Sequence, residues 1–211
     1  MNQDFTDDCA ERKEYIRRYW KYYEILENDC VSLMRYISFD TYNYGAYSDE
    51  IIKQFLSICA EVDNVCKNFC GYGPDGRPTF HDYASYLLVQ NNTSGYDIRN
   101  AKIILKINED AFSPFDGWNV EHASELEWWN AYNQVKHHRT DMYERGNLGN
   151  LLTSLAALYF LECLKFIKIS NDNSTEEKNI FDVPPNTSKL FYIEGLPTLS
   201  NVIGPELYGI M

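Results

Sequence analysis

The sequence contains no apolar run long enough to cross a membrane. Its most hydrophobic stretch, NLLTSLAALYFLECLKFIKI, includes Glu162 and Lys165 and is typical of a buried helix in a globular protein. The first residues, MNQDFTDDCAERK, are acidic and lack the apolar core of a secretory signal peptide. We therefore expect a protein that makes no membrane contact and is located in the cytoplasm.

Positive charge is scarce. The chain has 19 Lys and Arg against 31 Asp and Glu, which gives a formal net charge of -12 and a pI of about 4.7. Proteins that hold duplex DNA by its phosphates normally carry a basic stripe, so this balance argues against bulk nucleic-acid binding but allows a local basic pocket. The surface is acidic and the chain has 17 Tyr, which is compatible with a protein partner as much as with a small ligand.

Cysteine motifs are absent, although the chain has six cysteines. No CxxC occurs and no His spacing completes a zinc set, so we expect reduced thiols, packed in the core where they fall on apolar stripes. Cys66 and Cys70 are four residues apart and could form a redox pair, but that spacing on a helix is poorly shaped for a disulfide.

A glycine-rich phosphate loop, a GxSxG elbow and a nucleotide fingerprint are also absent, and we expect no cofactor.

The first half of the chain predicts two long helices. Residues 9–38 and 49–70 each repeat apolar residues at alternating spacings of four and three, which is typical of amphipathic helices. Glu27 falls within the apolar stripe of the first helix and interrupts it. Ser48 is suited to cap the start of the second helix. We expect the two helices to pack antiparallel as a hairpin.

The second half predicts a third and a fourth long helix with a small sheet. The third begins near Glu121, and the fourth spans about 147–168 and is apolar nearly all round, so it should be central. A short helix is expected at 79–90. AKIILKI, at 101–107, is typical of a strand, and KLFYIEGL could pair with it.

These patterns predict a mainly α fold, a bundle of four long helices with a small two-stranded β accessory. The 211 residues suit one compact unit. Residues 1–170 would form the bundle, with the strand insert near 101–107. Residues 171–211 would form a linker, a short strand and a C-terminal tail that packs on the bundle.

The stretch WWNAYNQVKHHR, at 128–139, concentrates the polar residues of most chemical interest. On a helix, Trp129, Asn133 and His137 form one column, and Trp128, Tyr132 and Lys136 form the next. One interpretation is a phosphate site, in which Lys136 and Arg139 hold a phosphodiester, His137 acts as general acid or base and Asn133 orients it. The alternative is a polar seam of the core, with Asn133 joining two helices and His137 bonded to a helix carbonyl.

YNQVKH resembles the signature helix of HEPN-domain proteins, a family of α-helical bundles. The family pattern is an Arg, a polar residue such as Asn, and a His four to six residues after the Arg. Here the polar residue is Asn133 and the His is His137, while Tyr132 stands at the Arg position. In active members the Arg and His of two subunits meet at a dimer groove and cleave RNA without a metal. Tyr132 carries no positive charge, so either Lys136 and Arg139 replace it or this chain does not cleave.

The resemblance covers about residues 10–168 and implies a homodimer that acts on RNA or a nucleotide, in a bacterial phage-defence or toxin–antitoxin system. It implies His137, Asn133 and Tyr132 as catalytic positions, with Lys136 and Arg139 binding phosphate. We also expect Trp128 and Trp129 to be exposed on a monomer and covered in a dimer. The alternative function is a non-catalytic protein-interaction or dimerisation module.

Two further patterns are weaker. His122 and Glu125 form an HxxE, near Glu121 and Glu127. Glu61 and Asp63 of the second helix could add carboxylates to a metal site. These side chains are more simply explained as solvated charges, and we predict no metal site.

Arg77 and His81 also have the Arg-to-His spacing of the HEPN pattern. They lie on either side of a turn, so they should not share a helical face.

Overall fold

The computed structural model describes residues 11, 13–90, 97–121, 126–172 and 188–194. Within these residues the α-helices are α2 (Lys21–Leu33), α3 (Asp49–Phe69), α4 (Phe80–Ala84), α5 (Glu127–His138) and α6 (Leu148–Asp172). A π-helical segment, Ile16–Trp20, leads directly into α2, and another, Ser85–Gln90, follows α4. The strands are β1 (Ile103–Leu105), β2 (Ala111–Phe112) and β3 (Phe191–Ile193).

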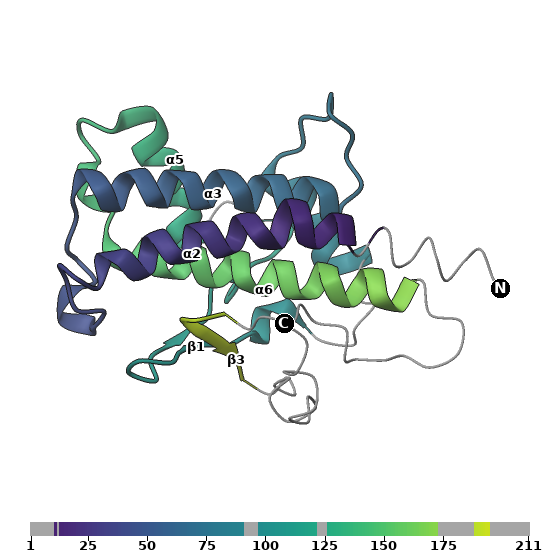
Figure 1. The fold of residues 1–211 in the computed structure, drawn as a ribbon. Coiled ribbons are helices and arrows are strands. Elements are labelled where there is room, and N and C mark those ends of the chain that lie inside the picture. The colour runs from purple at the N-terminus through teal and green to yellow at the C-terminus, as the bar shows by residue number, and fades with distance from the viewer. Residues whose placement is uncertain (1–10, 12, 91–96, 122–125, 173–187, 195–211) are drawn as a thin grey trace, which may run out of the picture.

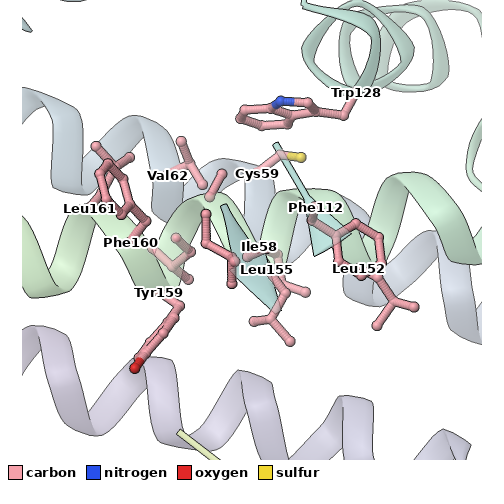
Figure 2. Packing of buried hydrophobic residues seen from close by; sticks show 14 of the residues in the cluster. Ile58, Cys59, Val62, Phe112, Trp128, Leu152, Leu155, Tyr159, Phe160 and Leu161 are labelled. Atoms are coloured by element: carbon pink, nitrogen blue, oxygen red, sulfur yellow. The ribbon is translucent and has the colours of Figure 1, made fainter. Parts of the chain in front are cut away.

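The centre of the fold is the pair α3 and α6, which run in the same direction (Figure 1). Tyr47 and Asn147, which precede the two helices, form an isolated β-bridge. At the other end, Lys165 Nζ lies 3.5 Å from the carbonyl oxygen of Asn68. Leu152, Leu155, Phe160 and other α6 side chains are fully buried, and Figure 2 shows them packed against α3. The prediction that α6 is the central helix is confirmed.

The N-terminal helix packs antiparallel to this pair. The Tyr15 hydroxyl donates to Glu162 in the second half of α6, and the rings of Tyr23 and Tyr159 stack with centres 5.7 Å apart. The described helix ends at Leu33 and continues only as a turn, so the predicted end near residue 38 is wrong by about one turn. The predicted cap of α3 is confirmed, because Ser48 Oγ accepts a hydrogen bond of 3.2 Å from the Ile51 amide.

The sheet has three antiparallel strands in the order β2-β1-β3, with Ile104 facing both Ala111 and Tyr192. The predicted pairing of the 101–107 strand with the KLFYIEGL strand is confirmed. The two-stranded prediction missed β2, which has only two residues and therefore shows no alternating pattern.

Glu27, which interrupts the apolar stripe of α2, holds β3 against the helices. Its buried Oε1 accepts hydrogen bonds from the Tyr23 hydroxyl at 2.9 Å, from the Leu190 amide at 3.1 Å and from the Ser188 hydroxyl. A buried carboxylate is tolerated where several donors satisfy it. The acidic residue in the stripe is thus the anchor of a strand more than 160 positions away in the chain.

The fold is mainly helical with a small antiparallel sheet, as predicted. The finer prediction, a bundle of four long helices, does not describe it well, because α5 has 12 residues and α4 has 5. The third helix begins at Glu127, and residue 121, where we expected its start, is in a turn. No helix of the described residues combines the length and hydrophobicity that a membrane span requires.

The described cysteines are free thiols, and all except the half-buried Cys70 are buried. Burial raises the pKa of Cys70 to about 12 and raises the pKa of the four others further. A thiol that resists ionisation is a poor nucleophile and a poor metal ligand. Cys9 lies outside the described residues.

Candidate functional site

One face of α5 is part of the aromatic core. The Trp128 indole donates a hydrogen bond of 2.7 Å to the Pro114 carbonyl oxygen, and its ring lies next to Cys59 of α3 in Figure 2. Trp129 stacks on Phe80 of α4 with ring centres 4.1 Å apart. Both tryptophans are buried, at 2% and 6% exposure. The expectation that they are exposed on the monomer is wrong, so they provide no argument for a dimer.

Tyr132, at the position of the family's Arg, lies in the same core. Its side chain is 7% exposed, and its ring packs on Trp129, with centres 5.0 Å apart, and edge-on to Phe55 of α3. Lys136 Nζ lies 5.3 Å from the centre of the Tyr132 ring, a cation–π contact one helical turn along α5. The Tyr132 ring thus contacts the Lys136 ammonium group with its face.

The last turn of α5 is exposed and carries two cations, Lys136 and Arg139, with two histidines between them. Lys136, His137, His138 and the C-cap residue Arg139 all face solvent, and no described residue forms an ion pair with any of them. Three other described cations are paired, Lys53 with Glu50, Lys67 with Asp63 and Arg145 with Glu127, each at 2.6 Å. Because His137 is exposed, the interpretation in which it is a core residue is not supported.

Asn133 is half-buried and faces a cavity of about 370 Å3. The cavity is also lined by Asp63 of α3, His81 of α4 and Glu121, with Trp129 and Phe80 among its apolar residues. Asp63 accepts from the Tyr83 hydroxyl at 2.8 Å and pairs with Lys67 at 2.6 Å, so its charge is largely compensated. The cavity is therefore polar and weakly acidic, whereas the adjoining helix end is basic.

His81 and Asp63 are the residues that sequence reasoning did not join to Asn133. They come from α4 and α3, and no spacing along the chain relates them to α5. Arg77 precedes Thr79, the N-cap of α4, whose side chain and that of Asp82 form a capping box. Arg77 therefore lies outside the helix that carries His81, and the prediction that the two share no helical face is confirmed.

The carboxylates considered for a metal site lie in different places. Glu61 is buried on α3, where desolvation raises its pKa, and it lies close enough to the buried Glu162 of α6 to raise the pKa of that residue too. Among the described residues no three His, Cys, Asp or Glu side chains are grouped to hold a metal ion. His122 and Glu125 lie outside the described residues.

Comparisons with family models, with curated proteins and with solved structures found no match to this chain. The HEPN resemblance of the α5 sequence therefore stays a prediction from its motif.

Proposed function

We propose that this protein is an RNA-directed effector that binds the sugar-phosphate backbone at the exposed last turn of α5. The observation that carries the proposal is the pair of Lys136 and Arg139, two exposed cations without ion pairs to the described residues of a chain of net charge -12, with the exposed His137 and His138 between them. An acidic protein repels polyanions at long range, so a site for RNA needs such a local concentration of uncompensated cations.

The neighbouring cavity would take a different part of the ligand. Asp63 and Glu121 make it unsuited to phosphate, whereas the Asn133 amide can pair with a base edge or a ribose hydroxyl. Lys136 and Arg139, at the exposed end of α5 beyond Asn133, would then contact the neighbouring backbone phosphates. With a base in the cavity and the phosphates at Lys136 and Arg139, single-stranded RNA fits better than a duplex, because its bases are free to leave the stack.

Cleavage would need an acid–base group and a cation at the same phosphodiester. His137 is the acid–base candidate, and Lys136 and Arg139 are the cations that would replace the Arg of the family pattern. Tyr132 would support Lys136 through its ring and take no part in proton transfer. A second copy bound at the same helix would double the charge at the scissile phosphate, as in the two-fold groove that the HEPN resemblance implies, in a bacterial defence or toxin system.

The same residues can also have a purely structural role, which is to stabilise the C-terminus of α5. Cations in the last turn of a helix stabilise it by about 0.3–1 kcal/mol each, because they complement the exposed carbonyl groups at its C-terminus. On that account, His137→Ala and Lys136→Ala would lower stability and leave RNA binding unchanged.

The test is incubation of the full chain with total single-stranded RNA, followed by sequencing of the RNA ends and by fluorescence anisotropy with a labelled oligonucleotide. We expect binding that Lys136→Ala and Arg139→Ala weaken, and any cleavage to disappear in His137→Ala. Lys102→Ala, an exposed lysine beside the sheet, is the matched control and should change nothing. A wild-type protein that neither binds nor cleaves RNA would contradict the proposal and favour the interaction or dimerisation module.

A further inference from the structure

Glu162 of α6 is a fully buried carboxyl group that the proposed α5 site does not use. Its Oε2 accepts a hydrogen bond of 2.5 Å from the Tyr15 hydroxyl, but its Oε1 has no hydrogen-bond partner among the described residues. A buried carboxylate needs several donors to compensate its charge, whereas a neutral carboxyl group needs fewer. The surroundings of Glu162 therefore suit its protonated form.

The groups around Glu162 add no positive charge. Among the described residues, those that act on it or respond to it are the Tyr15 and Tyr19 hydroxyls, Glu61 of α3 and the adjacent Cys163 thiol. Burial raises the pKa of Glu162 to about 8 against the lowering effect of the Tyr15 hydrogen bond, and Glu61 adds to the rise. Glu61 is itself 7% exposed, so an ionised Glu162 would face a second carboxyl group in a poorly solvated part of the core.

The N-terminal segment, residues 13–19, contacts this part of α6 through Tyr15. The Tyr15 ring packs with Phe166 and Ile169 in a small apolar cluster that is separate from the main core. The chain then passes through the π-helical turn Ile16–Trp20 before α2 begins, and such turns within helices are frequent at functional sites. A segment held by a small cluster opens at lower cost than the central helices do.

We propose that the N-terminal segment is a pH-sensitive latch, which is closed on α6 while Glu162 is protonated and opens when Glu162 ionises. Opening lifts Tyr15 away, water solvates Glu162 and Glu61, and the proton of Glu162 passes to the solvent. Opening also exposes Phe166 and Ile169 on one face of α6. Because only the closed latch holds this proton between pH 4.5 and about 8, its stability is greatest at low pH, falls across that window and changes no further above it.

Amide hydrogen exchange of the full chain, read by mass spectrometry between about pH 5 and 9, tests the latch. After correction for the intrinsic exchange rate, the protection of residues 13–20 should fall by up to about tenfold per pH unit and level off near pH 8. A peptide of α3, residues 55–62, should stay at least about a hundredfold better protected at every pH. Protection of 13–20 that does not change with pH, or that equals that of the α3 peptide throughout, would overturn the proposal.

Two variants separate Glu162 from other groups that titrate. Glu162→Gln keeps the shape of the side chain and cannot ionise, so the protection of residues 13–20 should become independent of pH. Glu61→Gln removes the repulsion, so the fall should level off at a lower pH than in the wild type. Glu144→Gln, at an exposed carboxyl group, should follow the wild type. The wild-type profile in Glu162→Gln, or an unshifted plateau in Glu61→Gln, would contradict a latch controlled by these two carboxyl groups.

Discussion

Lys136 Nζ lies 5.3 Å from the centre of the Tyr132 ring, so a buried aromatic side chain holds an exposed cation in place. Tyr132, which the HEPN resemblance places at the Arg position, is thus not a surface residue. It is a core residue whose ring face supports the neighbouring charge. A cation–π contact at a partly exposed site is worth about 0.5–1 kcal/mol, enough to bias the Lys136 side chain toward one orientation.

The burial of Tyr132 predicts that Tyr132→Arg will not create an active site. The guanidinium would enter a core formed by Trp129 and Phe55 without a carboxylate partner, at a cost of about 3–5 kcal/mol in the free energy of unfolding. Tyr132→Phe keeps the ring and should cost about 1 kcal/mol or less. Urea denaturation of both variants measures this, and an undiminished midpoint for Tyr132→Arg would show that position 132 is not core.

The central position of α6 predicts large effects from truncating its side chains. Leu155 and Leu158 are fully buried, so replacing either with Ala should reduce the free energy of unfolding by about 2–5 kcal/mol. Tyr42 is 95% exposed, and Tyr42→Ala is the control that should leave the denaturation midpoint unchanged. Small effects at both leucines would mean that α6 is not the centre of the fold.

Glu27 is predicted to determine whether the C-terminal strand stays on the helices. Glu27→Ala removes the acceptor of the Tyr23 and Ser188 hydroxyls and leaves the Leu190 amide only Ser188 Oγ, at 3.2 Å, and should cost about 3 kcal/mol or more. Glu27→Gln retains an acceptor oxygen and should cost less. Hydrogen exchange at the amides of β3 should accelerate in the Ala variant, while Glu144→Ala, on the exposed turn before α6, should have no effect on it. Unchanged hydrogen-exchange protection of the β3 amides would show that Glu27 does not hold this strand on the helices.

Glu162 predicts a stability that falls as pH rises. Burial raises the pKa of its carboxyl from 4.5 to about 8, against the lowering effect of the Tyr15 hydroxyl, and the nearby Glu61 adds to the rise. Between these two pH values the folded protein binds more protons than the unfolded chain. The free energy of unfolding should therefore decrease by up to about 1.4 kcal/mol per pH unit across that window, and level off above about pH 8.

Glu162→Gln is the variant that tests this pH dependence. The amide cannot ionise, so the slope between pH 5 and 8 should shrink and the variant should exceed the wild type in stability at pH 8. Glu144→Gln, at an exposed carboxylate, should keep the wild-type slope. Parallel pH profiles for wild type and Glu162→Gln would mean that Glu162 is already ionised in the folded protein.

Much of the fold was predictable because its signals are local or periodic. The stripes of α3 and α6, the Ser48 cap and the pairing of β1 with β3 all follow from hydrophobic period and turn chemistry. The role of Glu27 was not predictable, since its donors Ser188 and Leu190 come from the other end of the chain. The two-residue β2 was missed because it is too short to show a pattern.

The α5 site was predictable only in part. The periodicity of 128–139 placed Asn133 and His137 in one column, but it could not show that Trp129 would be covered by Phe80 of α4. Nor could it bring His81 and Asp63 to Asn133, because three helices meet there. Whether a bulky residue is buried depends on which distant segment packs over it, and the local sequence pattern does not show this.

The salt dependence of RNA binding tests the α5 proposal most directly. If Lys136 and Arg139 contact phosphates, the logarithm of the association constant for single-stranded RNA should fall linearly with the logarithm of salt concentration. Each of Lys136→Ala and Arg139→Ala should reduce the magnitude of that slope by about 0.7, while Lys102→Ala leaves it unchanged. A wild-type slope near zero, or slopes that neither α5 variant alters, would contradict the proposal that α5 binds RNA.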